Sequence, residues 1–156
     1  MTFRALKTLA VSALVAVMIP VAAQAQWWEK HPGYLKAMSD LRTAYWLISH
    51  HETSDPAVNE PARHALVDIR YAYQFLKDAA ITDDKNIDDQ PPPDAMASDF
   101  RGRLHRASDL LQDAYDRVDR EEDDPAARGL RNHALHNIDK AVHSTHQAIR
   151  AWNFDF

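Results

Sequence analysis

The 156-residue chain contains no cysteine and only three glycines. Without thiolates, the protein cannot form disulfides, Cys-ligated zinc sites, iron–sulfur clusters or covalently attached c-type haem. The glycine-rich phosphate loops of nucleotide-binding proteins are missing too, because neither G-x-G-x-x-G nor the P-loop pattern occurs. These absences exclude several large classes of cofactor-dependent and nucleotide-dependent enzymes.

Acidic side chains outnumber basic ones by 23 to 18, which gives a formal net charge of −5. An acidic protein is a poor candidate for binding nucleic acid or anionic lipid surfaces. No G-x-S-x-G nucleophile elbow is present, and a cysteine nucleophile is excluded. The sequence therefore predicts no catalytic residues, and we expect a protein that is not an enzyme.

The first 25 residues have the pattern of a secretory signal peptide. Two basic residues precede an apolar stretch from Thr8 to Ala22, and the small-x-small pattern Ala23-Gln24-Ala25 follows. The apolar stretch is shorter than the ~20 residues that a membrane-spanning helix needs. We therefore expect residues 1–25 to be removed. The mature domain, residues 26–156, would be periplasmic or secreted, with no membrane span.

The remainder of the chain has the apolar period of amphipathic helices and no strand signals. Four stripes of apolar residues are separated by breaks that contain proline, and the second stripe starts at Pro61. The stripes comprise Tyr34, Leu41, Tyr45 and Ile48; Ala62, Leu66, Ile69, Tyr73, Leu76 and Ala80; Phe100, Leu104, Ala107, Leu111, Ala114 and Val118; and Leu135, Ile138, Val142, Thr145, Ile149 and Trp152. Four helices of similar length predict an all-α fold, an antiparallel up-down-up-down four-helix bundle.

Aromatic residues give the first candidate for a binding surface. In such a bundle both chain ends emerge at one pole, so Trp27 and Trp28 are expected close to Trp152, Phe154 and Phe156. This aromatic pole would either close the end of the bundle or present a surface to a partner. Trp46 lies about 140° from the centre of the apolar stripe on its own helix. It is therefore predicted to face solvent or a partner.

Histidines give the second candidate, because all nine lie within residues 26–156. Asp139, His143 and His146 are spaced four and three residues apart, which places them on one face of the last helix. Imidazole and carboxylate ligands suit divalent zinc, copper or nickel. The sequence therefore suggests a transition-metal site at these three residues, and the alternative is a solvated polar face.

Part of the sequence resembles a group of small exported bacterial helical proteins. The resemblance is carried by His31 to Arg42, with the letters HPGYLKAMSDLR, by Gly102-Arg103-Leu104-His105 and by Gly129 to Asp139. It covers most of the mature chain. The resemblance implies export and a helical fold, and it implies no particular activity.

A second, fainter similarity is to soluble periplasmic b-type cytochromes built as four-helix bundles. In that family a methionine of the first helix and a histidine near the end of the last helix hold a noncovalent haem. Met38 and His146 occupy comparable places, and Asp99-Phe100-Arg101 starts the third helix in a similar way. Methionine with histidine is an accepted axial pair. The similarity therefore implies haem b and electron transfer.

Together these patterns predict an exported, non-catalytic binding module of the cell envelope. The ligand is left open between three alternatives. It is a divalent transition metal at Asp139, His143 and His146, a haem b held by Met38 and His146, or a partner protein recognised without metal through Trp46 and the aromatic pole.

Overall fold

The computed structural model describes residues 33–50, 53–89, 99–120 and 125–154. The predicted leader lies outside the described residues, as do Trp27, Trp28 and Phe156. Of the predicted aromatic pole, Trp152 is described, and its side chain is half-buried against the core. Export, leader cleavage and the aromatic pole therefore stay predictions.

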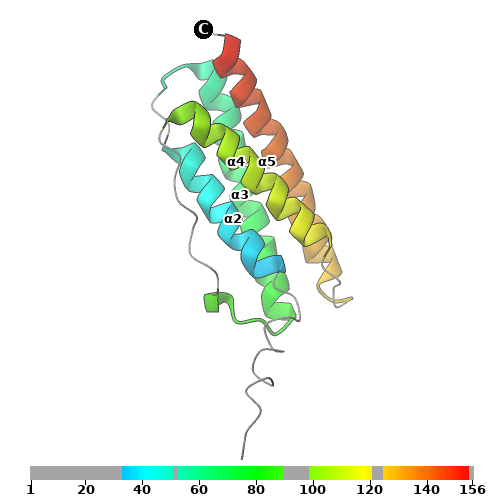
Figure 1. Ribbon diagram of the computed structural model, residues 1–156. Coiled ribbons are helices and arrows are strands. Elements are labelled where there is room, and N and C mark those ends of the chain that lie inside the picture. The colour runs from blue at the N-terminus through cyan, green and yellow to red at the C-terminus, as the bar shows by residue number, and fades with distance from the viewer. Residues whose placement is uncertain (1–32, 51–52, 90–98, 121–124, 155–156) are drawn as a thin grey trace, which may run out of the picture. The chain divides into compact units, whose positions relative to one another are not determined.

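The described residues form four long helices and no strand, which confirms the all-α fold (Figure 1). The helices are α2 (Gly33–Ser49), α3 (Pro56–Thr82), α4 (Phe100–Asp119) and α5 (Arg128–Phe154), with a short 3₁₀ helix, η1 (Ile87–Asp89), after α3. Along the part of the chain that is described, no helix combines the length and the apolar character needed to cross a bilayer.

Helix α3 begins five residues earlier than Pro61, the start predicted from the sequence. Asp55 caps the helix, because its Oδ1 accepts a hydrogen bond from the Ala57 backbone N–H at 3.0 Å. Pro56 follows at the first helical position, where a missing N–H has no consequence. Pro61 lies inside the helix and removes one internal hydrogen bond near its start. The polar stretch before Pro61 is therefore the first turn of a helix.

Each helix places several fully buried alanines in the core, and at least one of them follows a buried leucine or isoleucine by three residues. Small side chains at these positions allow the helix axes to approach one another, while the larger aliphatic side chains fill the space between layers. Alanines with this spacing include Ala44, Ala72, Ala114 and Ala141, which follow Leu41, Ile69, Leu111 and Ile138.

Side-chain contacts between three pairs of neighbouring helices fit an antiparallel arrangement, and the ribbon in Figure 1 shows neighbouring helices running in opposite directions. Phe75, late in α3, stacks on His133, early in α5, with ring centroids 5.1 Å apart. Arg117, late in α4, contacts Asp40 in the first half of α2. Arg131, early in α5, donates to the backbone oxygen of Val118 at the end of α4. The four-helix bundle is thus confirmed, with antiparallel neighbours.

The order of the helices differs from the predicted up-down-up-down arrangement. Helix α2 packs against α3 and α4, and α5 packs against the same two helices. Within the described residues α3 and α4 are not neighbours, and both run from the upper to the lower end of the bundle in Figure 1. The order is therefore up-down-down-up, which requires one long crossover connection between α3 and α4.

Candidate functional site

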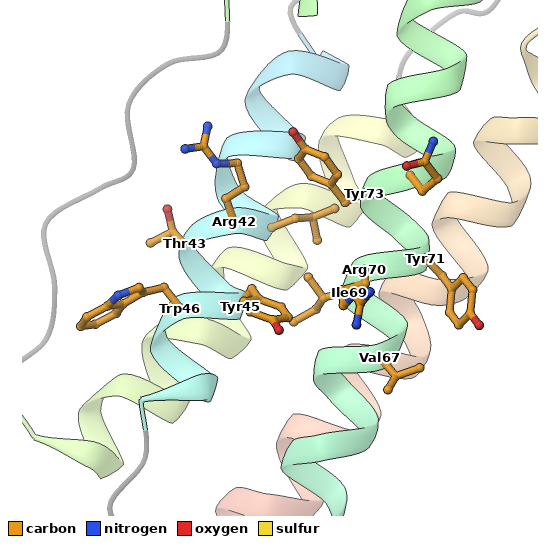
Figure 2. Close-up of a pocket in the computed structure, with 11 residues that line it drawn as sticks. Arg42, Thr43, Tyr45, Trp46, Val67, Ile69, Arg70, Tyr71 and Tyr73 are labelled. Atoms are coloured by element: carbon orange, nitrogen blue, oxygen red, sulfur yellow. The ribbon is translucent and has the colours of Figure 1, made fainter. Parts of the chain in front are cut away.

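A groove runs along the seam between α2 and α3 and has a volume of about 990 Å³ (Figure 2). We call it the α2–α3 groove. Buried Leu41 and Ile69 contribute its apolar surface, and the remaining lining residues are polar, aromatic or exposed. Those residues are Arg42, Thr43, Tyr45 and Trp46 from α2 and Val67, Arg70, Tyr71, Tyr73 and Gln74 from α3.

The two helices contribute arginine and tyrosine to the groove in matching positions. Arg42 of α2 lies level with Tyr73 of α3, and Tyr45 of α2 lies level with Arg70 of α3 (Figure 2). On each helix the tyrosine follows the arginine by three residues, so both project from the same face. Because the helices are antiparallel, each arginine stands across the seam from the tyrosine of the other helix.

Aromatic and apolar side chains extend the groove beyond both helices. Trp46 is half-buried, projects from the side of α2 that faces away from α3, and stacks on the His50 ring with centroids 4.2 Å apart (Figure 2). On the opposite side of α3, Val67 is 42% exposed and Tyr71 is 57% exposed. The predicted partner-binding residue Trp46 therefore belongs to a broad aromatic surface.

The charged residues that line the groove are both arginines. Arg42 and Arg70 are exposed, and neither forms an ion pair or a hydrogen bond with another described residue. Among the described residues, no aspartate or glutamate lines the groove. The groove is therefore locally cationic, although the whole chain is acidic.

Two nearby aspartates are held by other helices and do not neutralise these arginines. Asp40 accepts from Arg117 of α4 at 3.1 Å, and its side chain is 3% exposed. Asp68 accepts from Lys140 of α5 at 2.7 Å, and its side chain is 9% exposed. Each aspartate precedes a groove arginine by two residues, which places it on a different face of its helix.

A repeated sequence pattern marks this site, and the sequence analysis missed it. Residues Asp40-Leu41-Arg42-Thr43-Ala44-Tyr45 and Asp68-Ile69-Arg70-Tyr71-Ala72-Tyr73 share the pattern Asp-(Leu/Ile)-Arg-x-Ala-Tyr. Within each copy the aspartate pairs with the helix two places further along the chain, the alanine packs in the core, and the arginine and tyrosine line the groove. An internal-repeat search would have found the pattern, although only the fold shows that its two copies face each other.

The structure does not bring Asp139, His143 and His146 together as a ligand set. The Nε2 of His146 lies 2.7 Å from the Ser108 hydroxyl of α4, and the Nε2 of His143 lies 3.0 Å from the side-chain amide of Gln147. Across the described ranges, no group of three or more histidine, aspartate or glutamate side chains is placed to hold a metal ion. The histidines of α5 are therefore distributed along its exposed face.

Met38 and His146 are likewise not placed as an axial pair for haem. Met38 is fully buried in α2, whereas His146 is exposed on α5, and these two helices are not neighbours within the described residues. The contacts of Arg117 and Arg131 set the start of α5 level with the first half of α2. His146 lies fifteen residues beyond Arg131, a rise of about 22 Å along the helix. The two side chains therefore cannot face each other across one iron.

No family model matches the chain, and no curated protein or solved structure matches it significantly. The functional argument therefore rests on the geometry of the chain's own residues.

Proposed function

We propose that the protein is a non-catalytic binding module that recognises a partner protein through the α2–α3 groove. The observation that carries this proposal is the collection of arginine, tyrosine and tryptophan side chains in and beside one groove. Tryptophan, tyrosine and arginine are the residues that most often dominate the binding energy of protein interfaces. Trp46, the residue suggested from the sequence, lies at the edge of this set.

Packing of the bundle does not account for the exposed part of this surface. Leu41 and Ile69 already complete the core beneath the groove, while Val67 and Tyr71 remain about half exposed on α3. Large side chains gathered on an exposed face commonly mark an interaction site. Placement of the partner in the cell envelope is part of the proposal and is supported by the leader pattern in residues 1–25.

Site-specific photo-crosslinking in cells that produce the full chain tests this proposal. p-Benzoylphenylalanine would replace Tyr71 beside the groove and, as a matched control, exposed Gln112 on α4. Helix α4 lies diagonally across the bundle from α3, so position 112 reports on a different face. We expect an adduct of defined mass from position 71 and none from position 112.

The same experiment in a Trp46→Ala background tests the role of the groove edge. Loss of an interface tryptophan commonly weakens binding by about 2 kcal/mol or more, which corresponds to roughly thirtyfold. We therefore expect the adduct at position 71 to fall sharply. Equal adducts from positions 71 and 112, or no adduct from either, would contradict the proposal.

A further inference from the structure

We infer that the partner presents an acidic segment to the α2–α3 groove, with two carboxylates and at least one apolar or aromatic side chain. This inference rests on the proposed function and adds the chemistry of the partner. It is carried by the unpaired guanidinium groups of Arg42 and Arg70, by the absence of acidic residues from the part of the lining that the structure describes, and by the aromatic surface around them.

Charge complementarity identifies the sign of the partner. The chain has a net charge of −5, yet the described residues that line the groove include two cations and no anion. The two groove arginines therefore attract an acidic segment, although the chain as a whole is acidic. Arginine can bind a carboxylate through two parallel hydrogen bonds, an interaction stronger than one between neutral groups.

The spacing of the arginines suits two carboxylates. Arg42 and Arg70 occupy successive levels of the seam, three residues apart along the helix axis (Figure 2). Three residues rise about 4.5 Å, and packed helices lie about 8–10 Å apart, so their Cα atoms are separated by roughly 10 Å. Acidic side chains at alternate positions of an extended segment are about 7 Å apart. Arginine side chains are long and flexible, so the two guanidinium groups can reach both carboxylates.

The extent of the apolar surface favours a protein segment over a small anion. Trp46 lies on the far side of α2, while Val67 and Tyr71 lie on the far side of α3 (Figure 2). A small dianion could contact both arginines, but it would leave these side chains uncovered. A chain that crosses both helices would cover them with its own apolar side chains, which provides most of the favourable free energy of association.

A second copy of this protein is a poor occupant of the groove. A symmetric dimer through this face would bring four guanidinium groups together, because each copy contributes Arg42 and Arg70 and no acidic lining residue. Like charges across an interface are unfavourable by several kcal/mol. The charge pattern therefore indicates a different protein.

Calorimetric titration of the full chain tests the inference. The probe is a capped Phe-Ser-Glu-Ser-Glu-Ser-Phe peptide, the Glu-Phe peptide, whose two Glu and two Phe side chains share one face when it is extended. Matched peptides replace each Glu by Lys or each Phe by Gly, and succinate serves as a small dianion. We expect the Glu-Phe peptide to bind, with an affinity that falls as salt rises. The other three probes should bind at least tenfold more weakly.

Two protein variants complete the test. The double variant Arg42→Gln with Arg70→Gln should lower the affinity for the Glu-Phe peptide at least tenfold. Arg150→Gln, which removes an exposed arginine on α5, should leave it unchanged. Because the groove arginines are exposed and unpaired, the double variant should keep the wild-type thermal midpoint.

The outcomes separate this inference from the proposed function. Equal affinity for the Lys-Phe peptide, or unchanged binding by the double variant, would overturn the acidic assignment. Equal affinity for succinate would identify a small-anion site instead. If the crosslink from position 71 persists in the double variant, that result supports the proposed partner binding at the groove. It contradicts the inference that the partner presents an acidic segment to the two arginines. If the wild-type protein gives no adduct and does not bind the Glu-Phe peptide, both the proposed partner binding and the inferred acidic segment are contradicted.

Discussion

Arg117 donates from its Nε to the Oδ2 of Asp40 at 3.1 Å, across the seam between α4 and α2. The Asp40 side chain is 3% exposed, and its other oxygen accepts from Lys36 at 3.1 Å. Both oxygens of this carboxylate therefore accept a hydrogen bond from a cation, one on its own helix and one on a neighbouring helix. The ion pair ties the first half of α2 to the end of α4, while the groove arginine two residues later remains unpaired.

Arg117→Met should destabilise the bundle, because it leaves the buried Asp40 carboxylate with one partner fewer. Loss of a partner for a buried polar group lowers the free energy of unfolding by about 1–3 kcal/mol. Arg120→Met is the matched control, since Arg120 is 78% exposed and pairs with Asp116 on the surface. Urea denaturation should show a change within about 0.5 kcal/mol for the control. Equal effects of the two substitutions would show that the Asp40 pair has no special role.

Ala72→Leu should disrupt the packing of α3 in the core of the bundle. Ala72 is fully buried, and added side-chain volume in a packed core commonly lowers stability by about 1–3 kcal/mol. Ala57→Leu makes the same chemical change at an exposed position of the same helix, where the effect should stay within about 0.5 kcal/mol. Thermal unfolding of both variants provides the comparison, and an unaffected Ala72→Leu midpoint would contradict the packing described above.

Asp55→Ala distinguishes the observed start of α3 from the start expected at Pro61. Asp55→Ala removes the cap from the Ala57 N–H and should lower the free energy of unfolding by about 1 kcal/mol. Asp55→Asn keeps a capping oxygen and should retain most of the wild-type stability. The measurement is urea denaturation followed by circular dichroism. A helix that began at Pro61 would be insensitive to both substitutions.

Zinc coordination through the Nε2 atoms of His143 and His146 would have to break existing hydrogen bonds. The Nε2 of His146 is engaged by Ser108 and the Nε2 of His143 by Gln147, so affinity for zinc through these two atoms should be weak. If His146 is a ligand, Ser108→Ala should raise the affinity, since it frees the ring nitrogen. Calorimetric titration of wild type, Ser108→Ala and His146→Ala checks this. Identical titrations of all three would remove His146 from consideration as a ligand.

The sequence indicated the helices well because helix formation depends on local patterns. Spacings of three and four between apolar residues predicted α2, α4 and α5 close to their observed positions. The start of α3 was missed because the Asp55-Pro56 cap stands within a polar stretch that resembles a loop. The candidate residues on α5 were correctly placed on an exposed helix, but helical spacing alone did not show that Ser108 and Gln147 would engage their rings.

The sequence by itself determined that this chain forms amphipathic helices and that their apolar faces must meet in a bundle, because burial of those stripes is the dominant favourable term. The tertiary structure alone decided which helices are neighbours. It set α3 diagonally from α4 and turned Asp40 and Asp68 toward separate helices. It also placed the two Arg-x-x-Tyr faces on either side of one groove. The physical reason is that helical periodicity fixes the face on which a side chain lies, whereas the packing of the whole bundle selects what stands opposite that face.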